Sequence, residues 1–144
     1  MESKLLRIID ANFNRTKEAL RVCEDISRFY MDEPALTRKL KSCRHKVTRI
    51  LKSSPVEYKD LVSSRNAKQD VGKDSDYKNK SNLNGIFLAN MQRCKESLRV
   101  LEESHKILNG RLSEQFKNVR FGVYSIEKDA VKKMSKKNDS IRKS

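Results

Sequence analysis

Glycine and proline are scarce in this chain, which has four glycines and two prolines among 144 residues. Because these residues most often mark turns and interrupt regular structure, the sequence predicts few loops. Tryptophan is absent, and no apolar run approaches the roughly 18 residues that indicate a membrane-spanning helix. Charged residues make up 36% of the chain, so the composition favours long helices with charged outer faces.

Cysteine is scarce as well, with only Cys23, Cys43 and Cys94, and these form no CxxC pair. Their number is odd, and each falls at an apolar position of a helical pattern. We therefore expect three small buried hydrophobic residues in a reducing compartment rather than disulfides. The N-terminal segment "MESKLLRIID" is too polar for a signal peptide. The sequence thus predicts a cytoplasmic protein with no membrane partner.

Acidic residues are too few to balance the basic ones, with 19 against 33 and a net charge of +14. Such an excess suggests an anionic partner, which could be nucleic acid, a phosphorylated metabolite or a membrane surface. Much of it lies in residues 131–144, which we expect to form a solvated basic tail.

The most distinctive feature is an internal repeat. The segment "ANFNRTKEALRVCE" begins at Ala11, and "ANMQRCKESLRVLE" begins at Ala89, 78 residues later. Apolar residues recur around both segments at spacings of three and four, which is typical of an amphipathic helix. The apolar pattern of the helix that follows each segment repeats as well. The sequence therefore predicts an all-α fold, a bundle of four long helices built from two pseudo-symmetric helical hairpins with a central insertion.

We expect residues 1–130 to form a single helical domain, followed by the tail. Its parts are a hairpin over 3–53, an insertion over 54–84 made of a short helix and a loop, and a second hairpin over 85–130. Asp32 is expected to cap the second helix, with Pro34 in its first turn. Ser54 and Pro55 are expected to start the short helix.

The polar part of the repeat forms one slanting ridge on each of the two matching helices. A spacing of three residues places each side chain about 60° behind the previous one at 3.6 residues per turn. One interpretation is ordinary intrahelical ion pairing, preserved after duplication. The other is a polar site between the two halves, where facing ridges form an arginine-rich pocket. The ridges are Asn12, Arg15, Glu18 and Arg21, and Asn90, Arg93, Glu96 and Arg99.

Longer segments around the repeat resemble a known family. They are "RIIDANFNRTKEALRVCEDISRFYMDEPALTRKLKSCRH", "SSRNAKQDVG", "LANMQRCKESLRVLEE" and "VRFGVYSIEK". Over about residues 5–128 the chain resembles the monofunctional hydroxymethylpyrimidine phosphate kinase of bacterial thiamine biosynthesis, a domain often fused ahead of thiamine phosphate synthase. The resemblance implies a free-standing phosphomethylpyrimidine kinase that transfers the ATP γ-phosphoryl group to the pyrimidine monophosphate. ATP would be the co-substrate and Mg²⁺ the cofactor.

The glycine-rich phosphate loops of common kinases are absent, so a kinase on this scaffold would have to use side chains. Arginine suits this role because its planar guanidinium binds phosphate oxygens in pairs. The expected catalytic residues are Arg15, Arg93, Glu18 and Glu96. The expected substrate- and nucleotide-binding residues are Asn12, Asn90, Arg44, Arg120, Arg65, Asp70 and Gly72. The expected magnesium ligands are Asp10 and Asp70, because Mg²⁺ prefers hard oxygen ligands.

Two other classes of protein remain open at this point. The first is a basic nucleic-acid-binding protein, although the repeated ridges alternate in sign and aromatic side chains for base stacking are few. The second is a non-catalytic helical interaction module associated with thiamine phosphate synthase. The sequence also leaves open a homodimer.

Overall fold

Four long helices carry most of the fold in the computed structural model, which describes residues 2–72 and 82–143. They are α1 (Ser3–Ile26), α2 (Pro34–Lys52), α4 (Leu83–Leu108) and α5 (Gly110–Lys143). Between them lie a π-helical turn η1 (Ser27–Met31), a short helix α3 (Tyr58–Ser63) and a 3₁₀ turn η2 (Ala67–Gln69). Every regular element within the described residues is helical, which confirms the predicted fold class.

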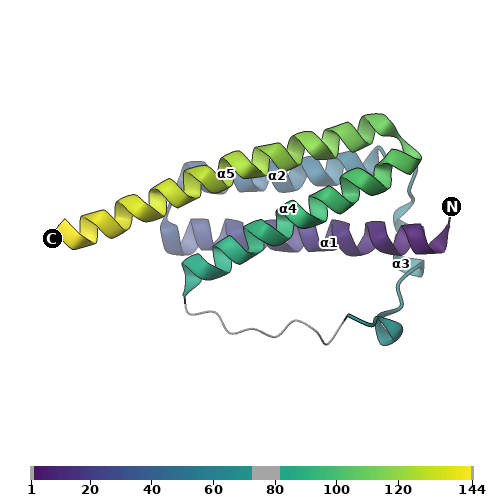
Figure 1. Cartoon of the computed structure of the whole chain (residues 1–144), viewed down its shortest axis with the longest axis horizontal. Helices are drawn as coiled ribbons and strands as arrows, with labels where there is room; N and C mark the ends of the chain where they lie inside the picture. The colour runs from purple at the N-terminus through teal and green to yellow at the C-terminus, as the bar shows by residue number, and fades with distance from the viewer. Residues whose placement is uncertain (1, 73–81, 144) are drawn as a thin grey trace.

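The helices are arranged as two antiparallel hairpins that pack against each other (Figure 1). The first hairpin is α1 with α2, and the second is α4 with α5. Helix α1 packs beside α4, and α2 packs beside α5. Helices α1 and α4 start at opposite ends of the bundle, as expected when two similar hairpins are related by a twofold axis (Figure 1). None of the helices in the described part of the chain is both long enough and apolar enough to cross a membrane.

The apolar stripes that define the repeat form the core. Leu20, Leu40 and Val47 of the first hairpin are fully buried, as are Leu98 and Phe116 of the second. The stripes bury one face of every long helix, so the two hairpins share one continuous core.

Polar side chains also meet inside the interface between the hairpins. The hydroxyl groups of Thr16 on α1 and Ser97 on α4 lie 2.6 Å apart and are both buried. Each hydroxyl also lies 2.8 Å from the main-chain carbonyl four residues earlier in its own helix. Because a hydroxyl has one proton, one of the two donates to the other hydroxyl while the second donates to its own carbonyl. A hydroxyl pair of this kind satisfies both groups without water, which makes close helix packing possible here.

Each hairpin contains a buried ion pair, and the two pairs are related by the repeat. Glu24 of α1 accepts from Arg44 of α2 at 3.1 Å. Glu102 of α4 accepts from Arg120 of α5 at 3.0 Å. All four side chains are at most 18% exposed. These contacts link the two helices of one hairpin, so part of the polar repeat serves the fold.

The arginine at the end of each ridge pairs with the glutamate of the corresponding ion pair. Arg21 lies 3.2 Å from Glu24, and Arg99 lies 3.9 Å from Glu102, both three residues apart on one helix. Both arginines are largely exposed and contribute little alone. Arg21 and Arg99 therefore do form intrahelical ion pairs, but with glutamates outside the ridges, and no ion pair joins the ridge residues to one another in the described chain.

Helix boundaries in the first half differ from the expected ones in two places. The N-cap of α2 is Glu33, while Asp32 adopts a left-handed conformation with φ 53° where the π-helical turn ends. Helix α3 begins at Tyr58 and not at Pro55, because the Ser54 hydroxyl is used elsewhere. It accepts from the Val56 amide and contacts a buried histidine of α4.

The predicted tail is a continuation of α5. The helix runs to Lys143, and Met134 is buried against the core although it lies beyond residue 130. Lys133 pairs with Glu33 at 3.5 Å, and the Lys137 ammonium donates to the Met31 carbonyl. The expected boundary at residue 130 is therefore not a helix end. Lysines surround the buried Met134 in the sequence, so the amphipathic pattern of α5 continues beyond residue 130.

The three cysteines are free and buried, as expected. Burial raises the pKa of Cys23 to about 12 and the pKa of Cys43 to about 11. Burial also raises the pKa of Cys94 well above its usual value. The thiols therefore stay protonated near neutral pH and act as packing groups.

The fully buried His105 makes stability depend on pH. Its Nδ1–H donates to the Leu101 carbonyl at 2.8 Å, and its Nε2 lies 3.3 Å from the Ser54 hydroxyl. Its ring packs against Phe116 in a tilted arrangement, with the ring centroids 4.7 Å apart. Burial lowers the pKa of His105 below its usual value. Since the unfolded chain then binds a proton before the folded chain does, stability is lost as pH falls below about 6.5.

We expect the urea midpoint of unfolding to fall between pH 7 and pH 5.5 in the native protein. The variant His105→Gln should be less stable than the native protein at pH 7, and its urea midpoint should change much less between pH 7 and pH 5.5. The other histidine, His45, is exposed and remains as an internal control. An unchanged slope in His105→Gln would contradict this assignment.

Candidate anion-binding pocket

A pocket of about 510 Å³ lies between the first half of α1 and the segment that follows α3. It gathers five of the residues that the sequence predicts for a site, and all five come from the first half of the chain. Its lining consists of Lys4, Arg7, Ile8, Asp10, Ala11, Asn12, Arg15, Arg65, Asn66, Ala67 and Asp70.

The helical period of α1 explains one wall of the pocket. Lys4, Ile8, Ala11 and Arg15 follow one another at spacings of four, three and four, so they share one face of the helix. The opposite wall comes from the chain after α3, which Leu61 anchors. Leu61 is fully buried, and α3 packs against α1.

An ion pair joins the two walls. The guanidinium of Arg65 binds both carboxylate oxygens of Asp10, with its Nε at 2.7 Å and its Nη2 at 3.0 Å. The hydrogen bond to this carboxylate raises the pKa of Arg65. Asp10 is buried and also accepts from Asn14 at 3.2 Å. Such a bidentate pair fixes the position of the insertion on α1.

Asn12 is buried at the floor of the pocket and holds a neighbouring arginine. Its Nδ2 donates to the Ile8 carbonyl at 2.8 Å, and its Oδ1 accepts from Arg15 at 3.4 Å. An asparagine in an apolar stripe needs such partners. Asn12 thereby orients the Arg15 guanidinium along the pocket wall.

Positive charge dominates the pocket. Its four cations face two carboxylates, and Asp10 already pairs with Arg65. Asp70 accepts the Gly72 amide at 2.9 Å. In the described chain no ion pair involves Lys4, Arg7 or Arg15. Lys4 and Arg7 lie near the N-terminal end of α1 and Arg15 lies near its middle. Three cations without an ion-pair partner in the described chain favour an anionic ligand.

The second ridge takes no part in this pocket. Asn90 is buried and donates to the Ile86 carbonyl at 2.9 Å, as Asn12 does to Ile8. Arg93 and Glu96 are exposed, and Glu96 accepts from Gln92 at 2.9 Å.

The interpretation of a pocket formed by both ridges gains no support from this pocket, to which only the first of the two ridges contributes residues. Helices α1 and α4 start at opposite ends of the bundle, so equivalent residues lie apart except near the crossing point (Figure 1). One contact between α1 and α4 is made by the hydroxyl groups of Thr16 and Ser97.

The remaining predicted residues have other surroundings. Arg44 and Arg120 form the ion pairs inside the hairpins and do not line the pocket. Glu18 is exposed on α1 outside the pocket lining. Gly72 contacts Asp70 through its amide.

The side chains around Asp10 and Asp70 do not support the predicted magnesium site. Both oxygens of Asp10 are bound by Arg65, and among the described residues no three His, Cys, Asp or Glu side chains gather. The assignment of Asp10 and Asp70 to a metal stays a prediction.

Lys4 and Arg7 were missed because neither has a counterpart in the repeat. The sequence does contain a signal for both residues. Lys4 falls on the same helical face as Arg15, and Arg7 follows Lys4 at a spacing of three residues. The partnership of Asp10 with Arg65, 55 residues away, has no signal in a single sequence.

By its fold and this pocket, the chain is a small helical bundle protein with a cation-rich pocket. A family model described as the ThiD2 family matches residues 7–129, and the chain belongs to this family. No solved structure matches it significantly.

Curated relatives are thiamine-phosphate synthases. The chain is 35% identical to that of Thermosynechococcus vestitus, covering 86% of this chain and 34% of the relative. For the synthase of Rhodopirellula baltica the identity is 30%, covering 96% of this chain and 37% of the relative. For that of Prochlorococcus marinus strain AS9601 it is 33%, with 97% and 39% covered. The chain thus spans about a third of the length of the curated relatives it matches.

These relatives confirm the link to thiamine biosynthesis and correct the predicted enzyme. The assignment as a phosphomethylpyrimidine kinase is wrong by this comparison, because the relatives are named thiamine-phosphate synthase.

Proposed function

We propose that this chain is a helical module of thiamine biosynthesis that binds a pyrimidine monophosphate and associates with thiamine-phosphate synthase. The observation that carries the proposal is the pocket beside α1, where Lys4, Arg7 and Arg15 have no acidic partner among the described residues. The similarity to about a third of each synthase supports a module that works together with that enzyme.

The pocket chemistry suits a phosphate monoester. Its second pKa is about 6, so the group is largely a dianion near pH 7. The exposed guanidinium groups of Arg7 and Arg15 can bind its oxygens in pairs, with Lys4 as a further point charge. Asp70 at the opposite wall can accept from an exocyclic amino group of the pyrimidine. A volume of about 510 Å³ is in the range of small-molecule sites.

Isothermal titration calorimetry with hydroxymethylpyrimidine phosphate tests the binding step. We expect micromolar affinity, at least about tenfold tighter than for the unphosphorylated alcohol, because the cations contact only the phosphate. Equal affinities for the two compounds would contradict the proposed recognition of the phosphate.

The module assignment has its own test. Mixed with a purified thiamine-phosphate synthase, the chain should co-elute in size-exclusion chromatography. With ATP, Mg²⁺ and the pyrimidine phosphate alone it should release no ADP. Separate elution would contradict the proposed association with thiamine-phosphate synthase. ADP formation would contradict the proposal that the chain only binds the pyrimidine phosphate.

A further inference from the structure

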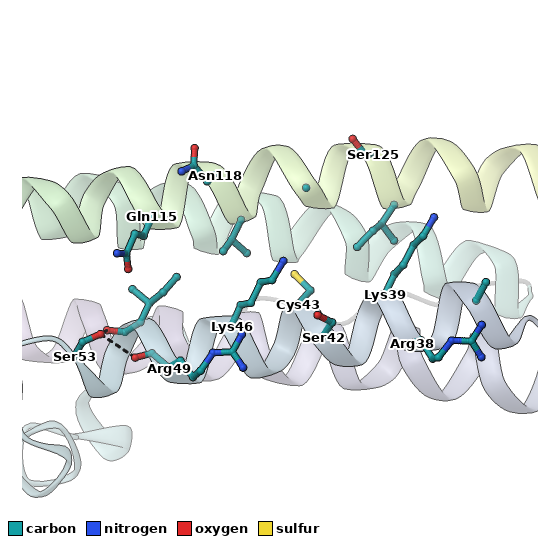
Figure 2. Close-up of a pocket in the computed structure, with 15 residues that line it drawn as sticks. Arg38, Lys39, Ser42, Cys43, Lys46, Arg49, Ser53, Gln115, Asn118 and Ser125 are labelled. Carbon is teal, nitrogen blue, oxygen red and sulfur yellow. Dashed lines mark hydrogen bonds between the residues drawn. The ribbon is translucent and has the colours of Figure 1, made fainter.

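A groove of about 850 Å³ runs between α2 and α5, separate from the pocket beside α1. Figure 2 shows residues from its two walls, with Lys39 and Lys46 extending from α2 toward α5 and Gln115 extending from α5 toward α2. Arg38 and Arg49 of α2 and Asn118 and Ser125 of α5 also line the groove. The floor is apolar and is formed by Cys43, Ile50, Val119 and Ile126.

The groove lies where the internal twofold axis passes between the hairpins. Its lining residues are matched across the two walls at the spacing of the repeat. The pairs are Lys39 with Gln115, Ser42 with Asn118, Cys43 with Val119, Lys46 with Gly122, Arg49 with Ser125 and Ile50 with Ile126. The paired residues of the floor are apolar in both halves of the repeat, whereas the paired residues of the two walls differ in charge and size. One wall is cationic, and the other is neutral with small or amide side chains.

The cationic wall has almost no counter-charge. No carboxylate lines the groove. Lys39 reaches Asp129 at 3.8 Å, and none of Arg38, Lys46 and Arg49 takes part in an ion pair within residues 2–72 and 82–137. Four cations along one wall are therefore complementary to a row of carboxylates. A second copy of this chain, with a net charge of +14, would bring like charges together.

The shape of the groove suits a helix. Helices pack into the furrow between two others when small residues let the backbones approach. Ser42 and Gly122 provide such positions, and a Cβ placed on Gly122 would meet nothing within 4 Å. From Arg38 to Arg49 the wall extends about 16 Å at 1.5 Å per residue, which equals three helical turns.

We propose that the groove between α2 and α5 binds an acidic amphipathic helix of a partner protein. The apolar face of that helix packs on Ile50 and Ile126, and its carboxylates contact Lys46 and Arg49. This inference is independent of the phosphate-binding pocket, because the two sites share no lining residue.

Fluorescence anisotropy with a labelled model peptide tests this proposal on the full chain. The peptide has Leu and Ala on one helical face and Glu along both edges. A scrambled peptide of equal composition and charge lacks the apolar face. We expect micromolar affinity for the first peptide and at least about tenfold weaker binding of the second. Equal binding of both would show non-specific charge attraction and overturn the proposal, as would no binding of either.

Variants locate the binding. Gly122→Gln fills the groove where there is open space and improves helix propensity, so it should fold and lose at least about tenfold in affinity. The double variant Lys46→Glu/Arg49→Glu should lose as much. Its control, Lys41→Glu/Lys52→Glu, changes exposed positions of the same helix outside the groove and should lose less than about twofold. Equal losses of peptide affinity in both double variants would contradict binding in the groove between α2 and α5.

Discussion

Replacing Glu102 with alanine should destabilise the protein by about 3–5 kcal/mol. The Glu102 side chain is 6% exposed and pairs with Arg120, whose side chain is 10% exposed. Removal of the carboxylate takes away the acidic partner of the Arg120 cation, which is largely buried between α4 and α5. Arg120 then keeps only weaker contacts such as the Phe121 ring, whose centroid lies 5.1 Å from the guanidinium carbon. Breaking a buried ion pair from one side in this way is strongly destabilising. Urea unfolding followed by circular dichroism measures the loss.

The adjacent Glu103 is the matched control. Its side chain is 45% exposed and pairs with Arg99 and Lys106 on the same helix surface. Glu103→Ala should therefore change stability by no more than about 0.5 kcal/mol. Glu24→Ala should resemble Glu102→Ala but with a smaller loss, because its partner Arg44 is 18% exposed. Similar stability of the Glu102 and Glu103 variants would contradict the structural role of the repeated pairs.

Replacing Arg15 with alanine should weaken the binding of hydroxymethylpyrimidine phosphate by about 10- to 100-fold. This corresponds to the loss of one charge-assisted hydrogen bond of about 1.5–3 kcal/mol. The exposed Arg15 makes only a 3.4 Å contact with Asn12, so the fold should be retained. Calorimetric titration of the variant measures the change.

The repeat supplies the control for this experiment. Arg93 is the counterpart of Arg15, is exposed as well, and lies outside the pocket. Arg93→Ala should change the affinity by less than about twofold. Equal losses for the two variants would restore the hypothesis of a site formed by both ridges.

The fold could be predicted from local patterns. The apolar spacing defines each long helix, and the duplication of that spacing after residue 85 indicates two similar hairpins. Pro34 marks the start of α2 correctly because proline is tolerated at the first helical position. These signals act within a few residues and therefore survive in a single sequence.

The site was predicted only in part. Asp10, Asn12, Arg15, Arg65 and Asp70 do line one pocket, but their partnership depends on where the insertion packs. The insertion has no helical period of its own beyond α3, so its contact with α1 could not be inferred. Residues 73–81 of the predicted loop lie outside the described residues.

The repeat itself misled the prediction of the remaining residues. Arg44 and Arg120 occur at equivalent positions beside apolar stripes, which suggested a shared function with Arg15 and Arg93. Their buried partner Glu24 and its counterpart lie on the other helix of the same hairpin, which a linear pattern does not show. A duplicated ion pair and a duplicated binding residue look alike in sequence, because duplication preserves both.

The binding of a phosphate monoester by the pocket beside α1 is tested most directly by nuclear magnetic resonance of the arginine side chains. In isotope-labelled protein, the Nε–Hε signals of Arg7, Arg15 and Arg65 should shift on addition of hydroxymethylpyrimidine phosphate. The signals of Arg44, Arg93 and Arg120 should stay in place. Shifts confined to Arg93 and its neighbours, or no shift at saturating ligand, would contradict the assignment of this pocket.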